Sequence, residues 1–203
     1  MHLPSAAIQP VAPRNLFRQP DTPSQQVVAA TGVGAAMRWA ISFLEANARS
    51  AEKPAVVLDI DGTILVNYRS GVTRRACGLS KLAKTCAKHG IEIFIITGRP
   101  DEPKNRRWTK RQLAKCQIAP IAKLYMRPPG ADYGACKFNQ RQEIKKNGHA
   151  ILLSVGDQWR DLRNDDAFDE LGDDKTFIGT IGDAHGYAIK LPLERIRAGE
   201  LAS

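Results

Sequence analysis

The stretch that decides the fold is Ala55–Leu65, which reads Ala-Val-Val-Leu-Asp-Ile-Asp-Gly-Thr-Ile-Leu. Its apolar run predicts a strand buried on both faces, as in a parallel sheet covered by helices. The run ends in Asp59 and Asp61, followed at once by Gly62. Ligands of open α/β sheets bind at the carboxyl ends of the strands, so we expect both carboxylates in a functional site. One could act as a nucleophile and the other as a proton donor; a turn that favours Asp and Gly is the alternative.

A second apolar run, Ile91–Ile96, also predicts a buried strand, and it ends at Thr97 and Gly98. A hydroxyl and an exposed backbone amide at a strand end can bind a phosphoryl oxygen. The alternative is that Gly98 and Pro100 only terminate the strand.

A third strand is predicted at Ala150–Val155, and it leads into Gly156-Asp157-Gln-Trp-Arg-Asp161-Leu162. Magnesium takes oxygen ligands from one or two carboxylates together with a substrate phosphate. We expect Asp157 to be a direct ligand and Asp161 to support it one helical turn further on. A helix N-cap with a favourable acid is the alternative.

Between these strands, Lys137 opens a polar segment that predicts a helix ending near Gly148. A lysine at a helix amino terminus opposes the helix dipole, which favours a role other than helix stability. A solvated lysine is the alternative.

The four segments, in this order, resemble the four motifs of the haloacid dehalogenase (HAD) superfamily of phosphohydrolases. Gly156–Leu162, Lys137 and Ile189–Pro192 are similar to the plant and bacterial class-B acid phosphatase group, subfamily IIIB. The likeness runs from about residue 36 to about residue 193. It implies a Rossmann-like three-layer α/β/α sandwich with a mainly parallel sheet of about five strands and a minimal cap.

The resemblance also implies roles for individual residues in phosphate binding and chemistry. Asp59 would be the nucleophile that becomes an aspartyl phosphate, and Asp61 the general acid and then base. Thr97 and Gly98 would bind the phosphoryl group, while Lys137 would neutralise its charge and orient Asp59. These assignments suit phosphoryl transfer, which depends on positioning and on stabilising spread negative charge.

For the metal, the resemblance implies that Asp157 holds Mg²⁺ together with Asp59 and the carbonyl of Asp61. Asp161 matches the second acidic position of the fourth motif. One departure concerns Gly62, because the acid phosphatase group usually has an acidic residue there. The first motif is therefore closer to that of the wider superfamily, which weakens the transfer of a substrate from the group.

Composition favours one soluble domain, because 203 residues with 43% hydrophobic and 25% charged residues are ordinary globular usage. Residues 1–26 are rich in Pro and Gln and predict a flexible tail without a signal peptide, and residues 27–203 predict a single HAD-like domain. Within it, Val27–Ala51 predicts an amphipathic helix packed on the sheet.

The four cysteines, at positions 77, 86, 116 and 136, lack the spacing of a zinc site and predict reduced thiols. Reduced thiols without a signal peptide predict a cytoplasmic location. No apolar run approaches the length of a membrane span, so none is expected.

The segments between the motifs leave little room for a cap domain. Val66–Glu92 holds only a loop and a helix at Leu79–His89, and Asp101–Cys136 fits one crossover, with a helix at Arg106–Cys116 and a strand at Ile121–Arg127. An open site favours bulky substrates or a lid supplied by a second subunit, so an oligomer is compatible with the sequence.

A net charge of +9 is more than phosphate-ester hydrolysis needs. Basic residues crowd around Trp108, and those that we expect to contact nucleic acid are Arg106, Arg107, Lys110 and Arg111. Such clusters attract phosphate backbones, and an aromatic ring can stack on a base; a solvated helix face is the alternative.

The sequence therefore predicts a magnesium-dependent phosphomonoesterase acting on a phosphorylated substrate through an aspartyl phosphate. A small nucleotide and a 3′-phosphate end of DNA or RNA both remain open as substrates. The alternative from another class is a catalytically weak nucleic-acid-binding protein on a phosphatase scaffold.

Overall fold

The computed structural model describes residues 27–66, 74–75, 78–162, 176–180 and 186–192. The predicted tail, residues 1–26, lies outside the described residues. So does part of Val66–Glu92, the segment that leaves little room for a cap. The described part of that segment forms a small two-stranded sheet of β3 (Leu65–Val66) and β4 (Arg74–Arg75).

The main sheet has seven strands. In spatial order they are β1 (Val27–Thr31), β8 (Thr176–Thr180), β9 (Tyr187–Lys190), β7 (Ala150–Gly156), β2 (Pro54–Leu58), β5 (Glu92–Pro100) and β6 (Lys123–Arg127). The five strands from β9 to β6 run parallel, whereas β8 and β1 pair antiparallel at one side. The mainly parallel α/β sandwich is as predicted, and the sheet is wider than the expected five or so strands because β8 and β1 extend it.

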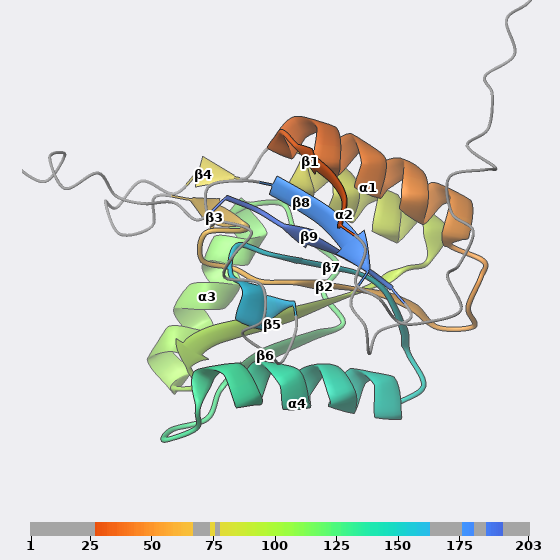
Figure 1. The fold of residues 1–203 in the computed structure, drawn as a ribbon. Helices are drawn as coiled ribbons and strands as arrows, with labels where there is room; N and C mark the ends of the chain where they lie inside the picture. The colour runs from red at the N-terminus through yellow and green to blue at the C-terminus, as the bar shows by residue number, and fades with distance from the viewer. Residues whose placement is uncertain (1–26, 67–73, 76–77, 163–175, 181–185, 193–203) are drawn as a thin grey trace, which may run out of the picture.

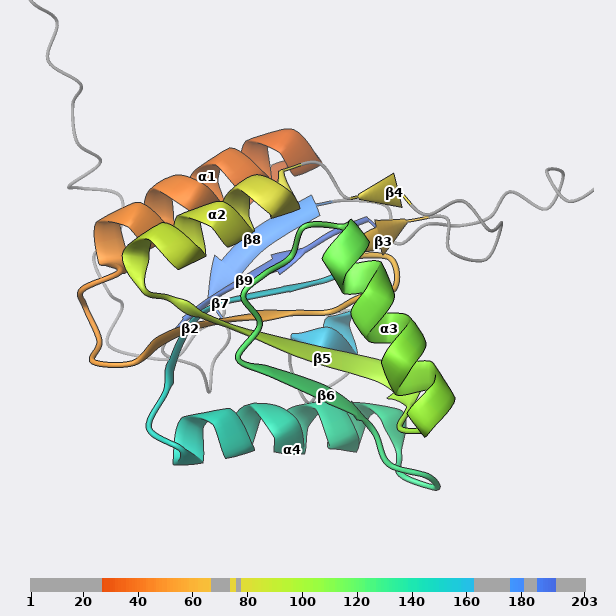
Figure 2. The same ribbon diagram turned by 180° about the vertical axis from the view of Figure 1, so that it is seen from behind.

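Helices cover both faces of this sheet (Figures 1 and 2). They are α1 (Val33–Asn47), α2 (Leu79–His89), α3 (Pro103–Lys115) and α4 (Tyr133–Lys146). The ribbon shows α1 and α2 together on one side of the sheet and α4 on the other (Figure 2).

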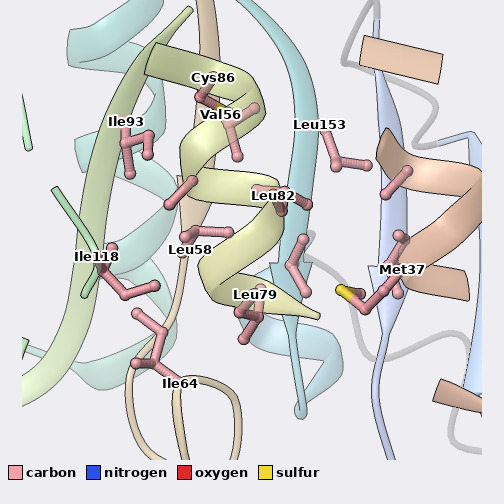
Figure 3. Close-up of a cluster of buried hydrophobic side chains, with 14 of the residues drawn as sticks. Met37, Val56, Leu58, Ile64, Leu79, Leu82, Cys86, Ile93, Ile118 and Leu153 are labelled. Carbon is pink, nitrogen blue, oxygen red and sulfur yellow. The ribbon is translucent and has the colours of Figure 1, made fainter. Parts of the chain in front are cut away.

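Alternation along β2 explains the two layers, because successive side chains of a strand point to opposite faces. Val56 and Leu58 belong to the larger core beneath α1 and α2, together with Leu113 from α3. Figure 3 shows Val56 and Leu58 packed among side chains of this cluster. Ala55 and Val57 face the smaller core with α4. All five β2 residues are buried, as the continuous apolar run predicts.

Several predicted boundaries are wrong: α3 begins at Pro103 instead of Arg106, and β6 begins at Lys123 instead of Ile121. Val27–Thr31 is a strand, and the helix expected over Val27–Ala51 begins only at Val33, after Gly32. The reason is tertiary: β1 pairs with β8, which lies far along the chain. Lys137 does not open its helix either, since α4 begins at Tyr133 and Lys137 lies in its second turn.

Candidate active site

Three neighbouring parallel strands bring the predicted residues to one edge of the sheet. β2 lies between β5 and β7, and Asp59 follows β2 directly, with its backbone N–H donating to the carbonyl of Val155 at 3.0 Å. Thr97 lies near the end of β5, and Asp157 follows β7. This is the edge at which α/β sheets bind ligands.

Lys137 is the central cation of the site. Its Nζ donates to Oδ1 of Asp59 at 2.6 Å and to Oδ1 of Asp161 at 2.5 Å. The lysine is only 1% exposed and Asp59 only 5%, so both charges depend on each other inside the protein. Asp161 was expected to support Asp157 one turn further on; it lies at the end of the short 3₁₀ helix η2 (Trp159–Asp161) and also contacts the lysine directly.

The pKa values of Asp59 and Asp157 are raised in spite of the nearby positive charge of Lys137. Burial raises the pKa of Asp59 to about 7 against the lowering effect of Lys137, and Asp161 adds repulsion. Burial, followed by repulsion from Asp59 and Asp161, raises the pKa of Asp157 to about 8. Burial alone would lower the pKa of Lys137, but the two adjacent carboxylates raise it above its ordinary value.

The acidic cluster of Asp59, Asp157 and Asp161 has the donor set of a divalent cation site. One carboxylate oxygen from each residue lies within 4.8 Å of the others, and all three residues are buried. Among the described residues, no group donates a hydrogen bond to the buried Oδ1 of Asp157, which is rare in proteins unless an ion or water completes such an acceptor. Hard oxygen ligands of this kind suit Mg²⁺, so the residues present fit the predicted metal.

Gly62 explains why the first motif departs from the acid phosphatase group. Its φ is +85°, and a Cβ at this position would overlap the carboxylate of Asp157. The backbone of the loop after β2 therefore packs directly on a candidate metal ligand. An acidic side chain at position 62 has no room in this conformation.

Asp61 lies apart from the acidic cluster. Both of its carboxylate oxygens accept hydrogen bonds from Arg99, at 2.7 Å from Nε and 2.5 Å from Nη2. Its side chain is 20% exposed, in contrast to the buried cluster. No role is predicted for Arg99 from the sequence, although it directly follows the Thr97-Gly98 pair.

Thr97 and Gly98 lie in the last part of β5, and Gly98 packs against Tyr133 of α4. Thr97 is 1% exposed, and its Oγ1 accepts a hydrogen bond of 3.3 Å from the backbone N–H of Arg99. A Cβ on Gly98 would overlap the ring of Tyr133, and the Nζ of Lys137 lies 4.9 Å from the centroid of the same ring. Tyr133 is a second residue that the sequence interpretation missed, although it precedes Lys137 by one helical turn.

The predicted nucleic-acid contacts lie on α3. Arg106 is paired with Asp101 through two hydrogen bonds of 2.9 and 2.6 Å, so its charge is already balanced. Arg107, Lys110 and Arg111 are exposed, and within the described part of the chain no ion pair involves them.

A surface pocket of about 640 Å³ lies between α3 and α4. Arg106, Lys110 and Lys123 line it together with Asp101 and Glu143. Its charge is therefore mixed, unlike that of a surface built only for phosphates.

The fold matches that of HAD-type acid phosphatases. The chain belongs to the HAD superfamily, subfamily IIIB (acid phosphatase): the model of this family matches residues 69–179, more than half of the chain. That segment contains Thr97, Lys137, Asp157 and Asp161, and it begins after the first motif.

The solved structures that are similar to the chain include two of a class C acid phosphatase. A class C acid phosphatase from Bacillus anthracis with tungstate bound has 18% sequence identity and a TM-score of 0.56, over 79% of this chain and 78% of that one. Another structure of the class C acid phosphatase from Bacillus anthracis has 19% identity and a TM-score of 0.50, and the match covers 64% of each chain. At this identity the likeness concerns the fold. No curated protein matches the sequence significantly.

Among the helices of the described residues, none has the length and apolar character needed to cross a membrane.

Proposed function

We propose that the protein is a magnesium-dependent phosphomonoesterase that works through an aspartyl phosphate on Asp59. The observation that carries the proposal is the buried contact of Lys137 with Asp59, beside an acidic cluster with an unpartnered oxygen on Asp157. Two like-charged aspartates near a third are costly in a protein interior. They have a purpose when a cation and a phosphate complete the site.

In the first step, Asp59 attacks phosphorus. The ion pair with Lys137 occupies Oδ1, so we assign Oδ2 as the attacking atom. A bond forms between Oδ2 and phosphorus while the bond from phosphorus to the leaving oxygen breaks. Lys137, Thr97 and the amide of Gly98 face the phosphoryl oxygens and stabilise their charge.

Asp61 acts as the general acid and then as the general base. It donates a proton to the leaving oxygen, which departs as an alcohol, and the phosphoryl group remains on Asp59. In the second step Asp61 accepts a proton from water as the water attacks phosphorus. The bond from phosphorus to Asp59 then breaks, which releases inorganic phosphate and restores the carboxylate.

Mg²⁺ would be held by Asp59 and Asp157, with the carbonyl of Asp61 and with Asp161 close by. When bound, the cation supplies positive charge that offsets the repulsion between the carboxylates and the phosphate. The raised pKa values of Asp59 and Asp157 support this assignment, because burial and mutual repulsion make both carboxylates costly to ionise until a cation is bound.

For the substrate, we propose a nucleotide or a 3′-phosphorylated nucleic-acid end. The support is the exposed face of α3, where Arg107, Lys110 and Arg111 lie near Trp108, which is 45% exposed. Cations bind the phosphates of a strand, and an exposed indole offers a surface for a base. The net charge of +9 acts in the same direction.

The same helix face supports the second candidate function, a nucleic-acid-binding protein with weak catalysis. The cluster at the strand ends argues against it, since binding alone has no need for buried carboxylates that repel one another.

The described cysteines support the proposed cytoplasmic location. Cys86, Cys116 and Cys136 are buried and form no disulfide within the described residues, and burial raises the pKa of Cys86 to about 12. Such thiols are typical of proteins from a reducing compartment.

The experiment is phosphate release from nucleoside monophosphates, sugar phosphates and 3′-phosphorylated oligonucleotides, with Mg²⁺ or EDTA. We expect release that needs Mg²⁺ and that is lost in Asp59→Asn. Absence of release from every substrate, together with salt-sensitive binding of oligonucleotide, would favour the binding protein.

A further inference from the structure

We infer that Arg99 is a positioning residue for Asp61, and that α3 fixes the orientation of Arg99. The inference rests on the proposed function, because it concerns the residue assigned there as the proton donor. It also gives α3 a role in the chemistry that is separate from its exposed charges.

The contact between Arg99 and Asp61 fixes the carboxylate in both direction and plane. Nε donates to Oδ2 at 2.7 Å and Nη2 donates to Oδ1 at 2.5 Å. A two-point contact between planar groups restrains both side-chain torsions of an aspartate, which a single hydrogen bond does not. Asp61 is also the most exposed of the predicted catalytic carboxylates, so packing restrains it less than it restrains Asp59.

Arg99 is in turn held by three residues of α3. Its Nη1 donates to Oγ1 of Thr109 at 3.0 Å and to Oε1 of Gln112 at 2.6 Å. Its guanidinium carbon lies 4.6 Å from the ring centroid of Trp108. The guanidinium is therefore restrained at its edge by two acceptors and on its face by an indole.

The arrangement is compatible with proton transfer. A carboxylate has about four acceptor sites, and the two contacts with Arg99 use one on each oxygen. A proton can occupy a remaining site while Arg99 retains a contact with the other oxygen. A positioned acid must lie within hydrogen-bond reach of the leaving oxygen, and restraint by Arg99 provides that position.

A residue that acts through the acid has an effect that depends on the leaving group. An alkyl alcohol is a poor leaving group and needs its oxygen protonated, whereas a nitrophenol leaves readily without a proton. Loss of Arg99 should therefore slow alkyl phosphates far more than aryl phosphates. A residue that only stabilised the fold or bound the phosphoryl group would slow both equally.

The test compares kcat/KM for p-nitrophenyl phosphate and for an alkyl phosphate in Arg99→Ala, Arg99→Lys and wild type. We expect Arg99→Ala to lose about 10²-fold on the alkyl ester, the lower range for a general acid, and less than about tenfold on the aryl ester. Arg99→Lys retains the charge without the two-point contact and should show the same selectivity. Added guanidinium should restore hydrolysis of the alkyl ester by Arg99→Ala.

Arg106 provides a matched control, since it makes the same kind of two-point contact with Asp101. Arg106→Ala should leave the ratio of the two rates unchanged. Gln112→Met, which removes one acceptor for Arg99, should shift the ratio in the direction of Arg99→Ala but by less.

Equal losses on both esters in the Arg99 variants would overturn the inference, and so would an unchanged ratio in Arg99→Lys. Asp61→Asn separates this failure from failure of the proposed function. If Asp61→Asn is selective for alkyl esters and the Arg99 variants are not, only the inference is wrong. If wild type hydrolyses neither ester, the proposed function itself fails and the inference falls with it.

Discussion

The substitution Asp157→Asn tests the charge imbalance of the acidic cluster without reference to a substrate. We expect it to stabilise the metal-free protein at high pH while it abolishes stabilisation by Mg²⁺. The reason is that burial and repulsion from Asp59 and Asp161 raise the pKa of Asp157, against the smaller lowering effects of a backbone hydrogen bond and of Lys137. Its Oδ1 has no hydrogen-bond partner among the described residues.

The magnitude follows from the geometry. Two unit charges separated by 4.8 Å, the spacing limit of the cluster, interact by about 3.5 kcal/mol at an effective dielectric constant of about 20. Asp157 is repelled by Asp59 and Asp161 and attracted by Lys137, so the net electrostatic cost of its charge is roughly one such repulsion. Removing it should stabilise the metal-free protein by about 3 kcal/mol, which for a chain of this size corresponds to a rise in Tm of about 6–12 °C.

The pH dependence identifies the origin of the effect. The folded-state pKa of Asp157 is raised from 3.8 to about 8, so the folded protein binds more protons than the unfolded chain between these values. Stability of the metal-free wild type is therefore lost as the pH rises from about 4 to above 8. At pH 5 only the first part of this loss has occurred, so the gain from Asp157→Asn should be largest at pH 9 and much smaller at pH 5.

The assay is thermal unfolding in EDTA and in Mg²⁺ at pH 5, 7 and 9. Glu45→Gln is the control, since it removes one negative charge at an exposed position of α1 and should change stability by less than about 0.5 kcal/mol. A lower Tm for Asp157→Asn in EDTA at pH 9 would refute the reasoning. An equal gain at pH 5 would show that packing, and not charge, is responsible.

Three further changes give separate outcomes. Lys137→Met should abolish activity and destabilise the metal-free protein by about 3–5 kcal/mol at pH 8, because it leaves Asp59 buried without its cation; urea unfolding measures this, and a cost below about 1 kcal/mol would contradict it. Gly98→Ala should cost about 1–3 kcal/mol and lower kcat, because its methyl group displaces the ring of Tyr133; unchanged melting and turnover would contradict the close contact. Arg111→Glu should weaken oligonucleotide hydrolysis in a salt-dependent way while p-nitrophenyl phosphate turnover stays the same; equal effects on both substrates would contradict a role in binding the strand.

The strands that carry the site could be predicted because each is a short apolar run that ends in a polar motif. The strand expected at Ala150–Val155 is β7, Ala150–Gly156, and the run at Ala55 lies within β2. Local pattern suffices where a strand is buried on both faces by its own neighbours.

The strand β1 could not be predicted in this way. Val27–Thr31 owes its conformation to pairing with β8, about 150 residues later in the sequence. The start of α4 could have been predicted from Asp132, a residue type that favours the N-cap. Asp132 caps the helix by accepting a hydrogen bond of 2.8 Å from the backbone N–H of Ala135.

In the site, residue types indicated which side chains carry charge, and the fold determines how they pair. Asp59 and Lys137 are predicted to interact, and Nζ of Lys137 lies 2.6 Å from Oδ1 of Asp59. The pairing of Asp61 with Arg99 was not foreseen, since it depends on how α3 lies over the end of β5. Side-chain contacts of this kind arise from tertiary packing and leave no periodic signal in the sequence.

The central claim is that phosphate passes through a covalent bond to Asp59. The most direct measurement quenches the reaction within the first turnover, reduces acyl phosphates with tritiated borohydride and maps the labelled peptide. The account predicts labelled homoserine at position 59, dependent on substrate and absent in Asp59→Asn. Phosphate release with no label at position 59, or with the label at another aspartate, would contradict it.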